Sequence, residues 1–549
     1  MTIAAAQNNA PPADSYACGA TEVPLIEQTI GAFFADMVAR QPEREALVSR
    51  HQGLRYTYRS LQTEAHRLAS ALLGLGLVPG DRVGIWSHNN AEWVLMQLAT
   101  AQVGLVLVNI NPAYRTSEVE YALNKVGCKL LVTMARFKTS DYLGMLRELA
   151  PEWVHGTPGL LRFSDLMARG NAADPRIAQV AATLRATDPI NIQFTSGTTG
   201  FPKGATLTHR NILNNGFFIG ECMKLTPDDR LCIPVPLYHC FGMVLGNLAC
   251  LTHGSAIVYP NDGFDPLTVL QTVQDEKCTG LHGVPTMFIA ELDHPRFAEF
   301  DLGSLRTGIM AGSPCPTEVM KRVVEQMNLR EITIAYGMTE TSPVSCQSST
   351  DTPLEKRVST VGQVQPHLEI KIVDPETGAV VPRGQRGEFC TKGYSVMHGY
   401  WGDETKTREA IDADGWMHTG DLATMDAEGY VNIVGRIKDM VIRGGENIYP
   451  REIEEFLYRH PQVQDVQVVG VPDPKYGEEL CAWIIAKPGT KPTEDDIRAF
   501  CKGQIAHYKV PRYIRFVAAF PMTVTGKIQK FKIRDEMTDQ LGLVEAKTA

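Results

Sequence analysis

The sequence has no apolar run long enough to cross a membrane. A membrane-spanning helix needs ~20 consecutive apolar residues. The most apolar stretch, Phe241–Leu251, is shorter and is interrupted by glycine and asparagine. We interpret it as a buried core segment and expect no membrane span.

Excess positive charge is also missing. The 549 residues contain 53 Lys and Arg against 62 Asp and Glu, a net charge of −9. Since no dense Lys/Arg run appears either, the sequence argues against a nucleic-acid-binding protein. Contents of 44% hydrophobic and 21% charged residues are typical of globular proteins and exclude a largely disordered chain.

Paired cysteines and an N-terminal targeting pattern are absent as well. The twelve cysteines include no C-x-x-C pair and no companion histidine spacing, so neither zinc nor a disulfide framework is predicted. Residues 1–21 contain no Lys or Arg, unlike a secretory signal or an Arg-rich transit peptide. We expect reduced cysteines and a cytoplasmic location.

What is present is a regular alternation of strand-like and helix-like segments. A chain of this length exceeds one ordinary core, so two or more domains are expected. Between residues 82 and 133, the alternation predicts a parallel sheet covered by helices. The predicted fold class is α/β, with a large N-terminal domain of parallel-type sheets with covering helices and a small, mobile α+β C-terminal domain.

The predicted elements follow from these patterns. Strands are expected at 54–58, 82–86, 105–108, 130–133, 190–194, 256–259, 305–310, 332–335, 368–373, 466–471, 482–486 and 514–517. Helices are expected at 24–40, 58–75, 90–102, 116–126, 266–276, 450–459 and 494–505, and residues 150–187 are expected to be irregular. Because the composition shifts near Gly435, the predicted division is 1–434, a connecting segment at 435–440, and 441–549.

A loop rich in glycine and hydroxyl groups follows the strand predicted at 190–194. Its glycines let successive N–H groups converge on an anion, its hydroxyls add donors, and Lys203 adds a mobile positive charge. The spacing differs from a Walker A loop, and a solvated surface loop has a similar composition. The residues predicted to bind phosphate are Thr195, Ser196, Gly197, Thr198, Thr199, Gly200, Phe201, Pro202 and Lys203.

Two later turns follow predicted strands. The turn Y-G-M-T-E ends in Glu340, and a carboxylate beside a phosphate site is unfavourable unless a cation lies between them, so Glu340 is predicted to bind Mg²⁺. The turn A-G-S-P has small residues that let a flat base approach the backbone. Taken alone, each is also an ordinary strand-end turn.

Three further short motifs carry charge. In W-M-H-T-G-D, the carboxylate of Asp421 is suited to accept from both hydroxyls of a cis-diol. Gly435-Arg436 adds a cation, and P-M-T-V-T-G-K-I ends near Lys527. A lone lysine in a glycine-bearing loop is usually a surface charge, so only the order of the set singles it out.

That order resembles the adenylate-forming enzymes, which include acyl- and aryl-CoA synthetases, luciferases and peptide-synthetase adenylation domains. The phosphate loop, Y-G-x-T-E, T-G-D, G-R-x-K and T-G-K occur in the family's order between residues 195 and 527. Three segments are most similar to acyl-CoA synthetases, near the medium-chain fatty acid–CoA ligases. They are I-N-I-Q-F-T-S-G-T-T-G, P-L-Y-H-C-F-G and I-R-G-G-E-N-I-Y-P.

The resemblance implies an acid–CoA ligase. ATP and a carboxylic acid, here a fatty and preferably medium-chain acid, would give acyl-AMP and pyrophosphate. The thiol of coenzyme A would then give acyl-CoA and AMP. ATP, Mg²⁺ and coenzyme A are the implied cofactors, and residues 1–434 would bind ATP and the acid.

The resemblance also implies roles for single residues. Catalysis would involve Lys527, His239, Thr339 and Glu340, the last of them at the metal. The nucleotide would contact Gly312, Ser313, Pro314, Tyr336, Gly337, Asp421 and Arg436. The C-terminal domain would rotate about Lys438, and Gly444 and Gly445 would then line the approach of the thiol.

His239 is predicted to be a wall between the acyl and nucleotide sites, although a lone histidine is more often a satisfied core residue. By family analogy the acyl pocket lies behind it. The residues implied there are Phe241, Gly242, Val244, His282, Gly283, Val284, Pro285 and Ala311. They suit a hydrocarbon chain, and they would serve equally as core.

Two other activities share these motifs. An amino-acid adenylation domain that loads a carrier protein usually has an Asp near residues 237–242 to pair with the substrate ammonium. That segment has none here, and an unpaired buried amine is costly. A luciferase-like monooxygenase stays open, as do the acyl chain length and the oligomeric state, a homodimer included.

Overall fold

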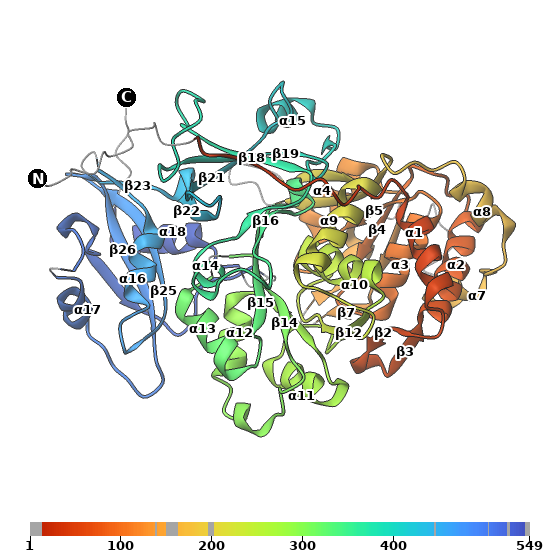
Figure 1. Ribbon diagram of the computed structural model, residues 1–549, viewed down its shortest axis with the longest axis horizontal. Coiled ribbons are helices and arrows are strands. Elements are labelled where there is room, and N and C mark those ends of the chain that lie inside the picture. The colour runs from red at the N-terminus through yellow and green to blue at the C-terminus, as the bar shows by residue number, and fades with distance from the viewer. Residues whose placement is uncertain are drawn as a thin grey trace, which may run out of the picture.

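The computed structural model describes residues 14–137, 140–149, 163–195, 202–313, 315–443, 446–502, 504–523 and 527–543. Two large sheets, one of six and one of nine strands, form the body of the molecule. Two five-stranded sheets and a two-stranded sheet of β7 (Arg136–Phe137) and β8 (Ser140–Asp141) accompany them. Figure 1 shows the C-terminal elements, in blue, as a separate lobe beside this body.

The six-stranded sheet has the order β20-β10-β9-β5-β4-β6. Strands β9, β5, β4 and β6 are parallel, whereas β10 and β20 join antiparallel. The strands are β4 (Arg82–Trp86), β5 (Val106–Asn109), β6 (Leu130–Thr133), β9 (Pro189–Thr195), β10 (Lys203–Thr208) and β20 (Gly399–Tyr400). The crossover helices are α3 (Ala91–Gln102) and α4 (Thr116–Val126), close to the predicted ranges.

The nine-stranded sheet has the order β17-β16-β15-β14-β13-β11-β12-β2-β3. It is parallel from β15 to β2 and antiparallel at both borders, so β13, β14 and β15 end at one edge. The strands are β2 (Glu45–Ser49), β3 (Leu54–Thr57), β11 (Arg230–Cys232), β12 (Ala256–Tyr259), β13 (Gly280–Gly283), β14 (Thr307–Ala311), β15 (Glu331–Gly337), β16 (Val344–Gln347) and β17 (Gln363–Val364).

One five-stranded sheet is wholly antiparallel and was not predicted as a unit. Its order is β1-β18-β19-β21-β22, with β1 (Tyr16–Cys18), β18 (Leu368–Val373), β19 (Gly387–Gly393), β21 (Met417–Met425) and β22 (Val431–Arg436). Each of its first three strands pairs with residues far away in sequence or across an irregular connection. Alternation alone therefore gave little indication of it.

The C-terminal lobe has its own sheet and core. The long hairpin of β25 (Val463–Asp473) and β26 (Gly477–Ala486) exceeds the short strands predicted there. The remaining elements are β23 (Val441–Arg443), β24 (Glu446–Ile448), β27 (Tyr513–Phe516), α16 (Pro450–Leu457), α17 (Glu494–Cys501) and α18 (Lys530–Gln540). Apolar side chains such as Ile453, Val466 and Leu480 fill the space between the sheet and its helices.

The other helices cover the two large sheets. They are α1 (Ile30–Arg40), α2 (Tyr58–Gly74), α5 (Tyr142–Leu149), α7 (Phe163–Ala168), α8 (Pro175–Ala181), α9 (His209–Cys222), α10 (Ala249–His253), α11 (Pro266–Glu276), α12 (Pro285–Leu292), α13 (Thr317–Gln326), α14 (Leu354–Ser359) and α15 (Glu404–Ala410). Within the described residues, no helix has both the length and the apolar character needed to cross a membrane.

Some sequence predictions were wrong in detail. The first helix begins at Ile30 rather than residue 24, because Thr29 is its N-cap and accepts from the backbone N–H of Ala32. Within the range predicted as irregular, α7 and α8 are helical, and α8 begins with Pro175 behind the capping side chain of Asp174. Residues 150–162 of that range lie outside the described residues.

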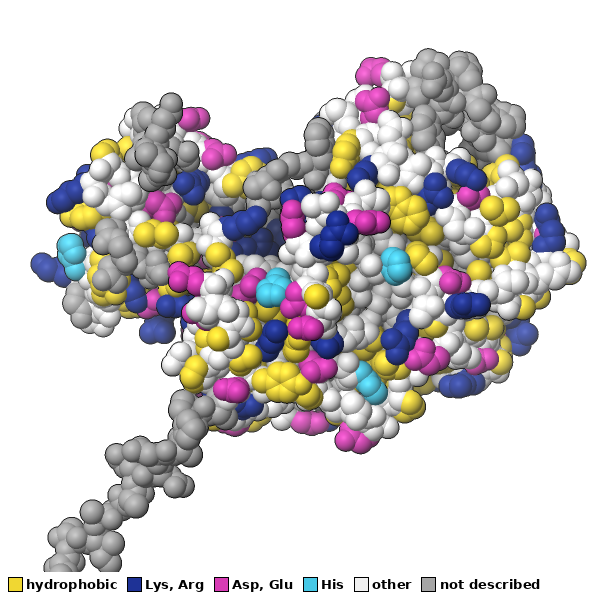
Figure 2. Space-filling view, turned by 90° about the horizontal axis from the view of Figure 1, so that it is seen from above, with side chains coloured by type: hydrophobic (Ala, Val, Ile, Leu, Met, Phe, Trp, Pro, Cys, Tyr) yellow, Lys and Arg dark blue, Asp and Glu magenta, His cyan; other side chains and the backbone are white. Residues whose placement is uncertain are grey.

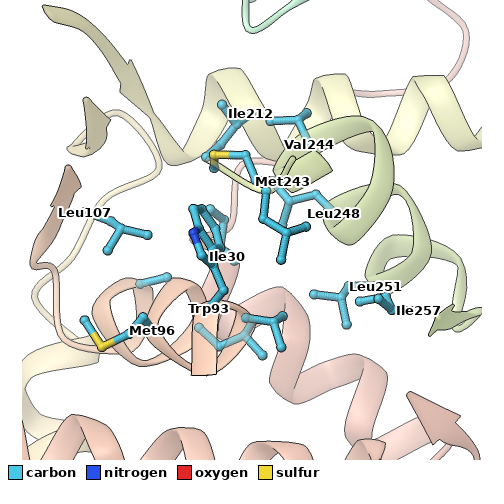
Figure 3. Close-up of a cluster of buried hydrophobic side chains, with 14 of the residues drawn as sticks. Ile30, Trp93, Met96, Leu107, Ile212, Met243, Val244, Leu248, Leu251 and Ile257 are labelled. Carbon is cyan, nitrogen blue, oxygen red and sulfur yellow. The ribbon is translucent and has the colours of Figure 1, made fainter. Parts of the chain in front are cut away.

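A single apolar core lies between the two large sheets. Trp93 of α3, Leu107 of β5 and Ile212 of α9 meet Met243 and Ile257 from the nine-stranded side (Figure 3). The predicted core segment after Cys240 is indeed buried, as a π-helix over Phe241–Leu248 followed by α10. This shared core fixes the two sheets relative to each other and brings the ends of β9 and β15 together.

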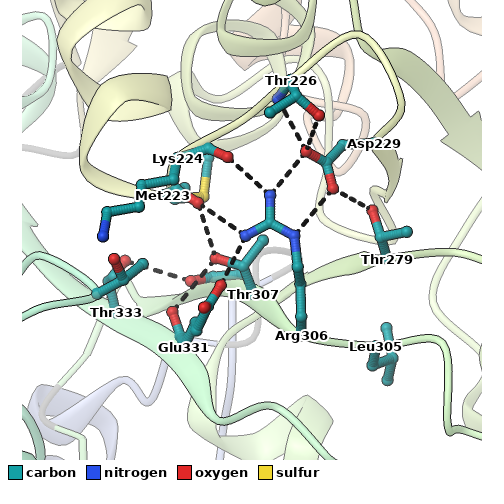
Figure 4. A network of polar contacts seen from close by, with 12 residues as sticks. Met223, Lys224, Thr226, Asp229, Thr279, Leu305, Arg306, Thr307, Glu331 and Thr333 are labelled. Carbon is teal, nitrogen blue, oxygen red and sulfur yellow. Dashed lines mark hydrogen bonds and ion pairs between the residues drawn. The ribbon is translucent and has the colours of Figure 1, made fainter.

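The amino-terminal edge of the nine-stranded sheet is held by a charged network (Figure 4). Arg306, just before β14, donates to Asp229 before β11 and to Glu331 at the start of β15, both at 2.7 Å. Thr279, before β13, donates to the other oxygen of Asp229 at 2.6 Å. Four neighbouring strands are thereby fixed in register at the edge where they begin.

Candidate active site

The predicted site residues gather where β14 and β15 end. Gly312 and Ser313 follow β14, Tyr336 and Gly337 end β15, and the next turn, Thr339–Thr341, carries Thr339 and Glu340. A Cβ on Gly337 would stand 1.7 Å from the carbonyl oxygen of Pro343, so no larger residue fits there. The parallel strands thus deliver an aromatic, a hydroxyl and a carboxylate to one edge of the sheet.

Tyr336 crosses from this edge to the antiparallel sheet. Its hydroxyl donates to Oδ2 of Asp421 at 2.7 Å, while Arg436 Nε donates to Oδ1 at 2.9 Å. Asp421 and Arg436 are also direct partners across β21 and β22. Burial, and next the charge of Asp421, raise the pKa of Tyr336, so the phenol stays protonated. Three predicted nucleotide residues therefore form one hydrogen-bonded group.

Glu340 lies where the two large sheets meet. Its Oε1 accepts from the hydroxyls of Thr195, at the end of β9, and Tyr400, in β20, at 3.1 and 2.8 Å. The ammonium of Lys203 lies 4.3 Å from the centroid of the Tyr400 ring. Glu340 is only 5% exposed. A buried carboxylate among hydroxyl oxygens is a donor set that suits a hard cation such as Mg²⁺.

Lys527 reaches this site from the C-terminal lobe. A Cβ on Gly312 would stand 3.7 Å from Lys527 Cε, and the φ of +92° at Gly312 favours glycine in any case. The backbone of Lys527 and Thr523 is joined by a hydrogen bond of 2.7 Å. Burial lowers the pKa of Lys527, and the charge of Arg436 lowers it further, whereas Asp421 and Glu340 oppose the shift. The lysine thus lies among the predicted nucleotide residues.

His239 faces the same lysine. Burial lowers the pKa of His239 to about 3, and the positive charge of Lys527 acts in the same direction. Its Nδ1 accepts from the backbone N–H of Phe241 at 3.2 Å, so the proton of the neutral ring is on Nε2. Its assigned role as a wall stays a prediction.

The residues predicted for the acyl pocket are all buried, and Phe241, the first of them, donates its backbone N–H to His239. The rings of Phe241 and His282 lie 5.4 Å apart, and burial lowers the pKa of His282 to about 4. His282 accepts from the N–H of Ile309 through Nδ1 at 3.2 Å, so Nε2 donates to the carbonyl of Leu245 at 2.9 Å. The buried members of this group are Phe241, Gly242, Val244, His282, Gly283, Val284, Pro285 and Ala311.

Several predicted residues cannot be placed. Those outside the described residues are Ser196, Gly197, Thr198, Thr199, Gly200, Phe201, Pro314, Gly444 and Gly445. Pro202 is described directly before β10, and Lys438 lies in a short helical turn, Ile437–Asp439, between β22 and β23. The assigned roles of these residues stay predictions.

Sequence reasoning missed three residues: Tyr400 and Cys240 beside the site, and Gln193, which contacts Cys240. Tyr400 binds Glu340, as described, and Cys240 donates its thiol to Oε1 of Gln193 at 3.2 Å. Burial raises the pKa of Cys240 to about 12, so it is a thiol rather than a nucleophile. Of these three, only Cys240 stood beside a residue already singled out.

Comparison with known proteins gives the family. The AMP-binding enzyme family matches residues 34–401, and the AMP-binding enzyme C-terminal domain matches residues 452–527. A putative acyl-CoA synthetase, YngI, from Bacillus subtilis is 49% identical over 94% of this chain and 99% of its own length. The human mitochondrial medium-chain acyl-CoA ligase ACSF2 is 44% identical over 96% of this chain and 91% of its own.

Solved structures agree with this assignment. ATP-bound MatB from Rhodopseudomonas palustris is 30% identical, with a TM-score of 0.82 over 93% of this chain and 99% of its own. The anthranilate CoA ligase AuaEII in complex with anthranoyl-AMP is 28% identical, with a TM-score of 0.86 over 95% and 99%. The predicted resemblance and the α/β fold class are thus confirmed, and the chain belongs to the AMP-binding enzyme family.

Proposed function

We propose that this chain is an AMP-forming acyl-CoA ligase, as its sequence predicted. It would join a carboxylic acid to the α-phosphate of ATP, release pyrophosphate, and pass the acyl group to the thiol of coenzyme A. The observation that carries the proposal is the position of Lys527, which reaches from the C-terminal lobe to Gly312 at the end of β14. The names of the relatives, acyl-CoA synthetase and medium-chain acyl-CoA ligase, support the same activity.

Nucleotide binding would use the group formed by Tyr336, Asp421 and Arg436. Asp421 already accepts two hydrogen bonds, one through each oxygen, and each oxygen has further acceptor capacity for the two ribose hydroxyls. Tyr336 would then lie beside the adenine. Gly312 would let the base approach the backbone closely.

Glu340 would hold Mg²⁺ through its carboxylate, with hydroxyl oxygens such as that of Thr195 nearby. The ion would supply positive charge that neutralises the phosphate oxygens. Thr339, beside Glu340 in the same turn, would donate to the α-phosphate. Tyr400 would hold the Glu340 carboxylate in position through its 2.8 Å hydrogen bond.

Lys527 would meet the negative charge that develops as the acid attacks the α-phosphorus. A preorganised cation at that point stabilises the transition state more than the ground state. Figure 2 shows a hollow between the C-terminal lobe and the body, with Lys and Arg side chains in it, where polyanionic ATP would enter.

The acid would lie behind His239 among the buried residues of the π-helix, β13 and β14. Neutral His239 and His282 leave this wall without net charge, which suits the apolar body of a fatty acid. We favour a medium-chain acid, with a cytoplasmic enzyme and coenzyme A as its acceptor. The relatives named ACSF2 are described as mitochondrial, and a homodimer stays open.

The second half-reaction would require the C-terminal lobe to turn. In the present orientation Lys527 lies close to Gly312, and the TM-score to MatB is higher for the ATP-bound structure, 0.82, than for the apo structure, 0.73. Rotation about the predicted hinge at 435–440, with Lys438 at its centre, would withdraw Lys527. Gly444 and Gly445 would then leave room for the thiol.

A pyrophosphate-release assay with a panel of fatty, branched and aryl acids tests the proposal. Coenzyme-A-dependent turnover with a medium-chain acid is the expected result. Release of pyrophosphate without thioester, followed by transfer to a carrier protein, would instead favour the adenylation-domain alternative.

The hinge is tested separately with synthetic acyl-AMP. Lys438→Pro fixes φ at the hinge, and Gly445→Leu adds bulk where the thiol would pass. Both variants are expected to form acyl-AMP from ATP and acid and to fail in converting it to acyl-CoA. Equal damage to both half-reactions in folded variants would contradict the rotation.

A further inference from the structure

Residues 419–421, which end in the proposed ribose-binding residue Asp421, form a bulge in the antiparallel pair of β19 and β21. Along β19, Glu388 pairs with Leu422 and Cys390 pairs with His418, so three residues of β21, Thr419 to Asp421, stand between two pairs that are only two residues apart on β19. The φ of +70° at Gly420 allows the sharp bend. Behind this bulge, Glu388, Cys390 and His418 bring their side chains together.

Their ligand atoms are close to one another. His418 Nδ1 lies 2.9 Å from Glu388 Oε2 and 3.5 Å from Cys390 Sγ. All three potential ligand atoms lie within 4.8 Å of one another. Glu388 and Cys390 are two residues apart on β19, so their side chains point to the same face of the sheet. His418 pairs with Cys390 across the strands and therefore shares that face.

A fourth side chain lies on the far side of the imidazole. Oδ2 of Asp412 is 3.5 Å from His418 Nε2, while its Oδ1 accepts from the backbone N–H groups of Asp414 and Trp416. Histidines that bind metals usually donate their other ring N–H to a carboxylate, which fixes the tautomer and the ring orientation. Asp412 is placed for that function.

We propose that Glu388, Cys390 and His418 form a binding site for a Zn²⁺-type divalent cation, with Asp412 supporting His418. A thiolate, an imidazole and a carboxylate are the three ligand types that Zn²⁺ combines, with a water completing the tetrahedron. Hard cations such as Mg²⁺ and Ca²⁺ prefer oxygen ligands alone.

The distances require little movement. Tetrahedral zinc with ordinary bond lengths places neighbouring N, O and S ligands roughly 3.4–3.6 Å apart. The separation of 3.5 Å between Cys390 Sγ and His418 Nδ1 already fits. The 2.9 Å contact between His418 and Glu388 must open by about half an ångström, and Cys390 Sγ starts within 4.8 Å of the Glu388 carboxylate. Binding releases the thiol proton of Cys390 to solvent. It also displaces the proton that His418 Nδ1 donates to Glu388, so the neutral ring carries its proton on Nε2, towards Asp412.

The site would act on the bulge without taking part in adenylation. The other oxygen of Glu388, Oε1, accepts from the backbone N–H of Gly420 at 2.9 Å, one residue before Asp421. Coordination through Oε2 leaves that hydrogen bond in place. A bound cation would therefore tie β19 to β21 directly behind the ribose carboxylate, and we infer a structural rather than a catalytic site.

Cobalt titration of the chelator-treated full chain tests this inference. Co²⁺ occupies zinc sites, and thiolate ligation produces an intense charge-transfer band in the near ultraviolet. We expect the band to saturate at one equivalent and to be displaced by Zn²⁺, and Zn²⁺ to raise the melting temperature of the wild type by mass action. Cys390→Ser should abolish the band and the thermal shift.

Two further variants sharpen the result. Asp412→Asn keeps the Oδ1 acceptor of the turn but removes the charge behind His418, and should weaken Zn²⁺ binding roughly 10- to 100-fold. Cys18→Ser removes the thiol of exposed Cys18 and should change nothing. A band that survives in Cys390→Ser, or that disappears in Cys18→Ser, would overturn the proposal, as would the absence of any saturable band in the wild type.

Discussion

The two edges of the nine-stranded sheet differ in the groups that are hydrogen-bonded to a buried carboxylate. At the edge where the strands begin, Asp229 is buried but meets Arg306 and Thr279 at 2.7 and 2.6 Å. At the edge where they end, Glu340 is similarly buried, and its carboxylate accepts from the hydroxyls of Thr195 and Tyr400. At the first edge the buried carboxylate is hydrogen-bonded to an arginine, whereas at the second it is hydrogen-bonded to hydroxyl groups, and a bound cation would stabilise it further.

This difference shows how one sheet combines stability with function. Burial raises the pKa of Asp229, but its hydrogen bonds from Arg306, Thr279 and Thr226 outweigh burial and hold that pKa below its usual value. The stabilisation is present above the unfolded-state pKa and is lost as the pH falls through the folded-state pKa. At the other edge, burial and the neighbouring Arg436 hold the pKa of Lys527 below its usual value.

The largest effect is expected from Lys527 at the carboxyl-terminal edge. Lys527→Ala should slow formation of acyl-AMP from ATP and acid at least a thousandfold, because the cation at the α-phosphate is lost. Conversion of supplied acyl-AMP to acyl-CoA should stay close to wild type, since that step follows withdrawal of the lysine. Single-turnover assays of the two half-reactions measure this, and equal damage to both in a folded variant would contradict it.

Glu340→Gln should produce the next largest effect. The amide keeps the size of the side chain but removes the charge, so the Mg²⁺-dependent adenylation step should slow by roughly two to three orders of magnitude. Its thermal stability should change little, because the amide oxygen can still accept the hydrogen bonds from Thr195 and Tyr400. Adenylation at the wild-type rate would rule out a role at the metal.

At the opposite edge the same kind of substitution should act on stability alone. Arg306→Met leaves Asp229 and Glu331 without their shared cation, and we expect a loss of about 2–3 kcal/mol in the free energy of unfolding. Adenylation at low temperature should remain. Lys321→Met, which removes an exposed ion pair with Glu318 on α13, is the matched control and should cost at most ~0.5 kcal/mol. Chemical denaturation compares the three proteins.

The sequence predicted the strands and the residues at the carboxyl-terminal edge better than the charged network at the amino-terminal edge. The strands at 82–86, 130–133, 256–259 and 368–373 agree with the structure to the residue. The first three are parallel strands whose mainly apolar runs have clear ends. The last is antiparallel and alternates apolar with polar residues. Glu340, Asp421 and Lys527 were singled out through short motifs, and the structure brings them close together, while their roles stay predictions. The charged network at the amino-terminal edge was not predicted. Nothing in the local sequence around Asp229, Arg306 or Glu331 indicates that these three side chains form ion pairs.

The residues that were missed share a physical cause. Tyr400 and Glu340 are 60 residues apart, and His418 reaches Cys390 only through the register of β19 and β21. Cysteine and histidine spacing gave no indication of the cluster formed by Glu388, Cys390 and His418, because that rule describes ligands on one short loop or helix. A site built across strands has no such spacing, and it becomes visible only when the register is known.

The smallest effect is expected from His239, and it separates the acyl pocket from the nucleotide edge. Its neutral ring is close enough to Lys527 to feel the charge of that lysine, and the buried π-helix begins two residues later in the sequence. His239 therefore lies between the lysine and the residues proposed to bind the acid. His239→Ala removes part of that wall without removing a charge, because burial already holds the pKa of His239 near 3. We therefore expect the KM for the fatty acid to rise about tenfold, corresponding to ~1.4 kcal/mol of lost contact, and the KM for ATP to change less than twofold.

His239→Phe restores the volume and should recover most of the acid affinity. Steady-state kinetics with each substrate varied in turn decide the matter: a rise confined to ATP would place His239 at the nucleotide edge instead.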